Sequence, residues 1–249
     1  MNEEDTPFPR YNFQQGAVLL VDKPKAWTSF DVVNKIRHQL KKRLKVKKIK
    51  VGHAGTLDPM ATGLLIICTG RATKTIQTYQ DMPKVYTGTM YIGATTPSFD
   101  AETEQDAVYP TDHINDTLIE QARQQFLGTI EQVPPMFSAI KVDGQPLYKR
   151  ARKGETIDVE PRSVHIESFE LTKIALPEIE FRVTCSKGTY IRALANDFGK
   201  ALRSGAYLIA LRRTAIGAYD VADAWQLEDL VRYIKDSELT KVEGTTRKG

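Results

Sequence analysis

The sequence predicts an α+β protein with a mixed, mostly antiparallel sheet flanked by helices and loops, and three observations support this class. Residues 16–21 and 64–68 are short apolar runs, which are typical of buried strands. Residues 86–92 and 179–185 alternate apolar and polar side chains, as half-buried antiparallel strands do. The order of elements is irregular and the glycine-rich nucleotide-binding motifs are absent, which argues against a doubly wound fold.

Four segments have the pattern of helices. Residues 28–40 begin with a capping hydroxyl and continue with apolar side chains at helical spacing. Residues 117–126 begin with a potential capping box. Residues 189–204 have one apolar face and stop before a glycine, and residues 227–234 have a short apolar face of their own.

The chain of 249 residues is 41% hydrophobic and is long enough to bury a core. We expect a flexible polar arm over residues 1–15, a single domain over residues 16–235 and a polar tail over residues 236–249. Residues 134–162 are rich in Gly, Pro and charge, which is typical of an irregular segment. No apolar run approaches the roughly 20 residues of a membrane span and the acidic N-terminus does not resemble a signal peptide, so we expect no membrane contact and a cytoplasmic location.

Neither a metal site nor a disulfide is expected. Cys68 and Cys185 each lie within an apolar stretch, so we expect buried free thiols. The four histidines are far apart in the sequence and no Cys-x-x-Cys pair occurs.

The net charge of +4 is unevenly distributed. Seven of the ten residues from Lys41 to Lys50 are Lys or Arg, and residues 148–153 hold four more. By contrast, residues 100–106 form an acidic patch with Asp100, Glu102, Glu104 and Asp106. The basic clusters suit contacts with nucleic-acid phosphates, but a solvated surface would have the same composition.

Three side chains are candidates for chemistry. Asp58 lies in a loop, residues 52–59 (Gly-His-Ala-Gly-Thr-Leu-Asp-Pro), where its carboxylate either acts chemically or forms a turn before proline. Arg192 follows a glycine turn at the start of a helix, where its charge could keep a carboxylate ionised or lie on the surface. Tyr86, in an alternating strand, could stack on an RNA base or pack in the sheet.

Taken in order, five segments closely resemble the tRNA pseudouridine-55 synthases of the TruB family. They are residues 22–24 (Asp-Lys-Pro), 52–65 (the Asp58 loop and Ala-x-Gly-Leu-Leu), 86–88 (Tyr-x-Gly), 185–192 (Cys-Ser-Lys-Gly-Thr-Tyr-Ile-Arg) and 211–213 (Leu-Arg-Arg). The resemblance covers roughly residues 16 to 220 and implies a pseudouridine-synthase-like catalytic domain.

The resemblance implies that the chain isomerises uridine 55, in the T-loop of tRNA, to pseudouridine without a cofactor. It assigns Asp58 as the catalytic residue, Arg192 as its partner, and Tyr86 as the ring that stacks on the flipped uracil. His53 would contact the RNA loop and help hold the target base extruded. The remaining substrate-binding residues are Tyr190 and Leu211, which would line the uridine pocket, and Lys23 and Pro24, which would lie beneath the site.

The same resemblance makes residues 132–162 the insertion that clamps the T-arm of the tRNA. Its basic side chains with Tyr148 suit that contact: Lys141, Lys149, Arg150, Arg152 and Lys153. About thirty residues follow the last matched segment, too few for a complete C-terminal RNA-binding domain. We therefore expect the Lys41–Lys50 run to contribute to tRNA affinity. We expect a monomer with no obligate protein partner.

Three alternatives stay open at the level of sequence. The chain could be an RNA-folding helper without catalysis, or a hydrolase that uses Asp58 with a second carboxylate. It could also modify another RNA with the help of a guide RNA, which the short tail argues against. Whether Asp58 attacks as a nucleophile or removes a ribose proton is likewise open.

Overall fold

The computed structural model describes residues 11–138, 140–142, 144–151, 153–155 and 157–236. The chain folds as two compact units, and each is described by itself. Unit 1 comprises residues 1–81 and 218–249, and unit 2 comprises residues 82–217. The expectation of a single domain over residues 16–235 stays a prediction.

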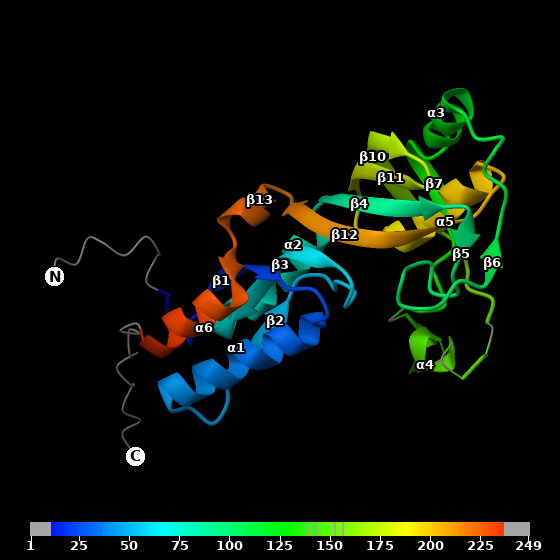
Figure 1. Cartoon of the computed structure of the whole chain (residues 1–249). Coiled ribbons are helices and arrows are strands. Elements are labelled where there is room, and N and C mark those ends of the chain that lie inside the picture. Colours follow the sequence, from blue (N-terminus) through cyan, green and yellow to red (C-terminus); the bar gives the residue numbers. More distant parts are fainter. Residues whose placement is uncertain (1–10, 139, 143, 152, 156, 237–249) are drawn as a thin grey trace, which may run out of the picture. The chain divides into compact units, whose positions relative to one another are not determined.

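Unit 1 packs two helices over a small sheet. Its strands β1 (Val18–Lys23) and β2 (Val51–His53) both pair antiparallel with β3 (Thr62–Thr69), and β14 (Trp225–Gln226) pairs parallel with β1. Figure 1 shows α1 and α6 side by side over these strands. The other elements of the unit are α1 (Ser29–Leu44), η1 (Gly70–Thr75), α2 (Ile76–Asp81), β13 (Tyr219–Asp220), η2 (Val221–Asp223) and α6 (Leu227–Asp236).

The predicted first helix is confirmed, and its ends follow from local chemistry. The Thr28 hydroxyl accepts a hydrogen bond from the Asp31 amide, while the Asp31 carboxylate accepts one from the Thr28 amide. Val32, Val33, Ile36 and Leu40 face the core together with the apolar side of α6. The helix ends at Leu44, beyond the predicted end at residue 40, so the first part of the basic run is helical.

Residues 11–15 differ from the expected flexible arm. Phe13 is 1% exposed in the core of unit 1, and its carbonyl accepts a hydrogen bond of 2.9 Å from the Thr69 hydroxyl. The ring of Tyr11 packs against those of Phe13 and Tyr233. Aromatic burial therefore fixes this segment, although its sequence is mostly polar. Residues 1–10 and 237–249, the rest of the arm and nearly all of the tail, lie outside the described residues.

Unit 2 is built on an antiparallel sheet with the strand order β12-β4-β11-β10-β7. α3 and α5 pack on one face of this sheet (Figure 1), where Phe126 and Phe198 meet Phe169 and Phe181 of the strands. The elements are β4 (Lys84–Ile92), β5 (Ala94–Thr95), β6 (Ala107–Val108), α3 (Asp116–Gln124), β7 (Gly128–Gln132), β8 (Lys141–Val142), β9 (Gln145–Pro146), α4 (Leu147–Ala151), β10 (Arg162–Ala175), β11 (Glu178–Cys185), α5 (Ile191–Ala201) and β12 (Ala206–Ile216).

Sequence patterns misplaced two features of unit 2. The capping box expected at Thr117 is wrong, because α3 begins at Asp116 and its cap is Asn115, whose side chain accepts a hydrogen bond from the Leu118 amide. β12 was not expected as a strand. Its register shifts after Leu208 and after Arg213, and these bulges break the alternation of apolar and polar side chains.

The predicted burial of both cysteines is confirmed. Burial raises the pKa of Cys68 and that of Cys185 to about 11 each, so both thiols stay protonated at neutral pH. Within the described residues, no helix is long and apolar enough to cross a membrane.

The predicted fold class is confirmed. Helices flank antiparallel strands in both units, and the β1–β14 pair supplies the parallel exception that makes the sheet mixed.

Truncating the aromatic core of unit 2 should be costly. Phe198 is fully buried among the rings that join α5 to the sheet. We expect Phe198→Ala to lower the free energy of unfolding by about 3–5 kcal/mol, measured by urea denaturation. Phe30→Ala is the matched control, because Phe30 is 61% exposed and should cost far less. Equal losses in the two variants would contradict this account of the core.

Candidate functional site

The Asp58 loop is held in unit 1 by backbone hydrogen bonds on both sides of the carboxylate. The Ser29 hydroxyl, which is 2% exposed, accepts from the Leu57 amide at 2.8 Å and lies 3.2 Å from the Leu57 carbonyl oxygen. The Pro59 carbonyl accepts from the Ala26 amide at 2.8 Å, and the Asp58 carbonyl accepts from the Ala61 amide at 3.1 Å. Asp58 itself is half-buried. Its carboxylate is therefore carried by a fixed backbone between β2 and β3.

Lys23 explains much of this rigidity. Its side chain is fully buried at the end of β1, and its ammonium donates to the carbonyls of Trp27 at 2.6 Å, Pro24 at 2.9 Å and Pro59 at 3.5 Å. A buried ammonium requires such acceptors, so the turn after β1 and the Asp58 loop are both gathered around it. That Lys23 and Pro24 lie beneath a uridine-binding site stays a prediction.

His53 is the last residue of β2, where it pairs with Ile67 of β3. Gly55 follows with a φ of 98°, a conformation that favours glycine. The strand end thus leads directly into the Asp58 loop, and His53 and Asp58 flank one short turn.

In unit 2, Tyr86 and Leu211 lie on the sheet face that α5 covers. Tyr86 is 9% exposed, and Val183 and Arg213 lie directly opposite it on the two neighbouring strands. Leu211 is 8% exposed and lies opposite Gly88. A Cβ at Gly88 would come within 2.7 Å of the Phe181 ring, so the absence of a side chain there permits close packing beside Leu211.

Tyr190 and Arg192 lie at the start of α5, as the sequence predicted. Tyr190 is the N-cap residue and is half-buried. Arg192 is only 4% exposed, so the surface position that its residue type favours is excluded.

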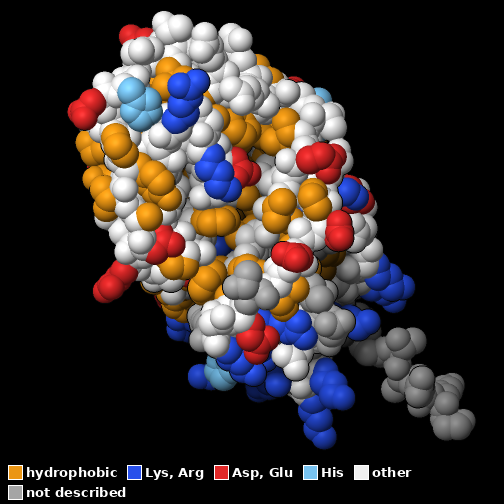
Figure 2. All heavy atoms as spheres, turned by 90° about the vertical axis from the view of Figure 1, so that its right-hand side faces the viewer, with side chains coloured by type: hydrophobic (Ala, Val, Ile, Leu, Met, Phe, Trp, Pro, Cys, Tyr) orange, Lys and Arg blue, Asp and Glu red, His pale blue; other side chains and the backbone are white. Residues whose placement is uncertain are grey.

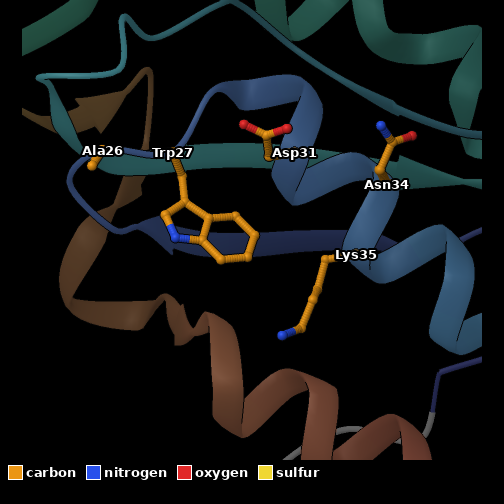
Figure 3. Close-up of a pocket in the computed structure, with 5 residues that line it drawn as sticks. All are labelled: Ala26, Trp27, Asp31, Asn34 and Lys35. Carbon is orange, nitrogen blue, oxygen red and sulfur yellow. The ribbon is translucent and has the colours of Figure 1, made fainter.

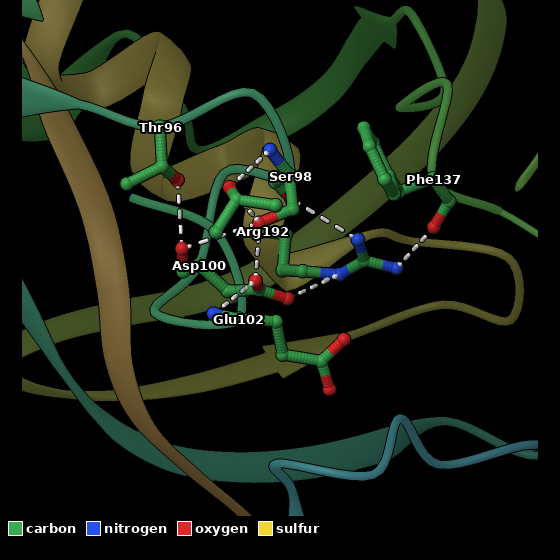
Figure 4. Close-up of polar contacts among 7 residues, drawn as sticks. Thr96, Ser98, Asp100, Glu102, Phe137 and Arg192 are labelled. Carbon is green, nitrogen blue, oxygen red and sulfur yellow. Dashed lines mark hydrogen bonds and ion pairs between the residues drawn. The ribbon is translucent and has the colours of Figure 1, made fainter. Parts of the chain in front are cut away.

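The guanidinium of Arg192 is surrounded by acceptors from two other segments. Its Nε lies 3.5 Å from a carboxylate oxygen of Asp100, and its terminal nitrogens donate to the carbonyls of Ser98 at 3.1 Å and Phe137 at 2.8 Å. Figure 4 shows these contacts converging on the guanidinium, while the carboxylate of Glu102 points away. Arg192 is thus a buried and charge-matched group.

Asp100 is held in place by its own loop. Its carboxylate accepts from the Ser98 hydroxyl at 2.5 Å and from the Glu102 amide at 3.0 Å, and its carbonyl accepts from the Thr96 hydroxyl at 2.7 Å (Figure 4). Phe99 adopts a φ of 62°, in the left-handed region, which closes this tight turn. The sequence groups Asp100 with three other acidic residues, but Asp100 itself is 1% exposed.

The predicted site residues therefore form two groups, one in each unit. Unit 1 holds Lys23, Pro24, His53 and Asp58, and unit 2 holds Tyr86, Tyr190, Arg192 and Leu211. That both groups face one uridine, and that Arg192 pairs with Asp58, stay predictions.

A pocket that the sequence did not indicate lies beside the N-terminus of α1. It measures about 360 Å³ and is lined by Ala26, Trp27, Asp31, Asn34 and Lys35 (Figure 3). Its polar groups are already engaged. Hydrogen bonds from Thr28 hold the pKa of Asp31 below its usual value, Asn34 accepts from Arg37, and Lys35 pairs with Glu228 at 3.1 Å. The pocket therefore offers few groups for a reaction.

The insertion over residues 132–162 contains secondary structure of its own. The β8–β9 hairpin leads into α4, which is anchored by the fully buried Leu147. Lys149 and Lys153 are exposed, and Arg150 lies 3.8 Å from Glu155. Arg152 and the side chain of Lys141 lie outside the described residues.

Hydrophobic and charged side chains of both signs mix on the face shown in Figure 2, which is the side that carries β6 in Figure 1. The exposed hydrophobic residues of unit 2 include Val108, Leu127 and Val133. Exposed positive charge is instead concentrated in unit 1. All seven basic residues from Lys41 to Lys50 are exposed. The Gly70 amide donates to the Lys50 carbonyl, which brings Arg71 and Lys74 of η1 near this run.

Two family models match the chain. Residues 41–191 match the TruB family pseudouridylate synthase (N terminal domain), and residues 192–242 match the tRNA pseudouridylate synthase B C-terminal domain. Together they contain Asp58 and all four site residues of unit 2.

Curated relatives extend this similarity over nearly the whole chain. A tRNA pseudouridine synthase B of Flavobacterium johnsoniae is 60% identical over 85% of this chain and 93% of its own length. One of Phocaeicola vulgatus is 54% identical over 93% of this chain and 98% of its own length.

Solved structures show the same fold. The crystal structure of a Cbf5-Nop10-Gar1 complex contains a chain with 30% identity and a TM-score of 0.67, aligned over 89% of this chain. An H/ACA RNP bound to a substrate RNA containing 2'-deoxyuridine contains one with 28% identity and a TM-score of 0.63, over 89% of this chain. This chain spans only about half the length of those two chains, 55% and 54%.

Removing the charge of Asp100 should destabilise unit 2. Asp100→Asn removes the negative charge that lies 3.5 Å from the buried Arg192 guanidinium, so we expect the free energy of unfolding to fall by about 3–5 kcal/mol in urea denaturation. Glu102→Gln, in the same loop but more accessible to solvent, is the control and should change it by about 0.5 kcal/mol or less. An Asp100→Asn protein as stable as the control would contradict the charge matching described here.

Proposed function

Because the chain belongs to the TruB family of pseudouridylate synthases, we propose that it converts uridine 55 in the T-loop of tRNA to pseudouridine, with Asp58 as its catalytic residue. The observation that carries this proposal is the fixed loop that presents the Asp58 carboxylate. Ser29 and Lys23 hold the backbone on either side of it, while the side chain is left half-buried. A reacting group gains from such support because little reorganisation is then needed in the transition state.

The reaction requires a carboxylate and a closed pocket, and it requires no cofactor. The N-glycosidic bond between N1 and C1′ breaks, the uracil rotates, and C5 bonds to C1′. The proton on C5 then leaves to solvent and N1 takes one up from solvent, so the product is an isomer of uridine. An ionised Asp58 either forms a covalent adduct or removes a ribose proton to give a glycal, and both routes end at the same product. The detached uracil must stay bound until it recombines, or hydrolysis would follow.

The unit 2 residues have roles that fit this chemistry. The target base must leave the stack, at a cost of about a few kcal/mol, and the Tyr86 ring replaces part of the lost stacking. Tyr190 and Leu211 line the uridine pocket. Arg192 keeps Asp58 ionised by its positive charge. His53, beside the Asp58 loop, contacts the RNA loop and helps hold the base extruded.

The substrate is a tRNA bound through its T-arm by the insertion over residues 132–162, and the protein works in the cytoplasm as a monomer. The names of the relatives, each a tRNA pseudouridine synthase B, support the choice of tRNA. The exposed Lys149 and Lys153 support phosphate contacts by the insertion.

The identity of the product and of the catalytic residue can be tested together. A tRNA transcript labelled with tritium at C5 of uridine should release its label with the wild type, and release should depend on a uridine at position 55. We expect Asp58→Asn to slow release by about 100-fold or more, because the variant can act neither as nucleophile nor as base.

Asp112→Asn is the matched control, because Asp112 is an exposed carboxylate of unit 2 and its removal should leave the rate unchanged. No release from any tRNA by the wild type would overturn the proposed function. Free uracil as the product would instead identify a hydrolase.

The basic run offers a second test, concerning affinity. We expect replacement of the seven Lys and Arg residues from Lys41 to Lys50 by Gln or Ser to raise the Kd for tRNA. The slope of log Kd against log salt should fall by about 0.7–0.9 for each phosphate that the variant no longer neutralises. Filter binding at several salt concentrations measures both, with Lys173→Gln as a control for one exposed charge. Unchanged affinity and slope would make the run a solvated surface.

A further inference from the structure

One buried side chain, that of Gln132, holds the backbone of Tyr190. The Gln132 amide is 1% exposed, and its oxygen accepts from the Tyr190 amide at 2.8 Å while its nitrogen donates to the Tyr190 carbonyl at 3.1 Å. This pair of hydrogen bonds resembles one rung of a β-ladder, formed between a side chain and the residue before α5. Tyr190 therefore does not depend on helix propensity alone for its position.

The ring of Tyr190 is held from a different direction. The guanidinium carbon of Arg162 lies 4.5 Å from the centroid of the ring, a cation–π arrangement. Val164 and Ile166, on the same face of β10 as Arg162, are buried, so Arg162 is directed toward the interior. Among the described residues Arg162 forms no ion pair, and its Nε is buried without a hydrogen-bond partner.

A charged side chain on an inward face needs a compensating contact. The Tyr190 ring supplies it, because the face of an aromatic ring carries negative electrostatic potential. A Cβ added at Gly188 would lie 3.9 Å from the guanidinium, so the glycine turn before α5 also lies beside Arg162. The contact thus joins the first residue of β10 to the turn that starts α5.

Gln132 and Arg162 are also neighbours of each other. They are directly opposite in the register between β7 and β10, and they are the first and last residues of the predicted RNA-clamping insertion. A third contact extends the pattern, since the Phe137 carbonyl, inside the insertion, accepts from Arg192. The insertion is therefore joined to both site residues of α5.

We propose that Gln132 and Arg162 are positioning residues for Tyr190, which fix its backbone and its ring so that the ring forms one wall of the uridine pocket. The inference rests on the proposed function, since it assumes that Tyr190 contacts the uridine. Neither residue touches the reacting atoms, and each acts through Tyr190.

The test compares Arg162→Gln and Arg162→Lys with Arg182→Gln, which removes an exposed arginine from β11. Two quantities are measured on one labelled tRNA: the single-turnover rate of tritium release and the Kd by filter binding. We expect Arg162→Gln to lower the rate by about 2- to 30-fold, the range of a cation–π contact, and to change the Kd no more than the control does. Arg162→Lys should retain an intermediate rate, because an ammonium can still lie over the ring.

A double-mutant cycle separates a positioning role from a structural one. In a Tyr190→Leu background the ring is absent, so Arg162→Gln should slow the residual reaction no further. Gln132→Met supplies a second probe and should also lower the rate with little change in Kd. If Gln132→Met fails to fold, the Arg162 series still decides, because Arg162 is only half-buried.

Three results would overturn the inference: a Kd raised beyond that of the control with an unchanged rate, a lysine variant no faster than the glutamine variant, or additive effects in the cycle. The first would make Arg162 a phosphate contact. These failures differ from failure of the proposed function, in which the wild type itself would release no tritium, and that result would overturn both.

Discussion

A guanidinium that is removed from water must have its charge and its donors matched, and much of unit 2 is arranged to meet this requirement at Arg192. Asp100 supplies the charge, while carbonyls of Ser98 and Phe137 accept from the terminal nitrogens. These acceptors come from a loop and from the insertion, neither of which is adjacent to α5 in the sequence. The tight turn at Phe99 is explained by the same need, because it presents the Asp100 carboxylate toward α5. Charge matching, in addition to apolar packing, therefore decides where the loop and the insertion lie.

Unit 1 meets a similar requirement at Lys23 with a different set of acceptors. Three backbone carbonyls accept from its ammonium, those of Pro24, Trp27 and Pro59. The result is that a buried cation fixes the chain immediately next to Asp58, while Ser29 fixes it on the other side. In each unit, then, polar contacts with backbone groups place a candidate site residue. In unit 1 the backbone beside Asp58 is bonded, and in unit 2 the Arg192 guanidinium bonds to backbone carbonyls. Such contacts set direction as well as distance, which is what an oriented reacting group requires.

The sequence predicted the fold class and the periodic elements because their side chains record burial directly. α1, β4, β11 and α6 show the expected alternation or helical spacing, and β3 contains the expected apolar run. Elements whose environment is set by distant residues were missed. β12 contains Arg213, which is 1% exposed and interrupts an otherwise apolar pattern, and Phe13 is buried within a polar segment. The burial of Asp100 was hidden for the same reason, since its neighbours in the sequence are acidic while its partner lies in α5. The catalytic assignment of Asp58 came from the ordered motifs and not from its local pattern.

The pairing of Gln132 with Arg162 has a consequence for how the insertion can vary between related proteins. Strand pairing at the base of a loop fixes the positions of the residues that it joins. Their positions then depend little on the length and composition of the loop between them. Beyond Phe137, the hairpin and α4 can therefore be exchanged, lengthened or recharged without altering the start of α5. The insertion is in this sense structurally separable from the start of α5. A segment of a relative grafted between residues 138 and 161 should therefore leave the positions of Tyr190 and Arg192 unchanged.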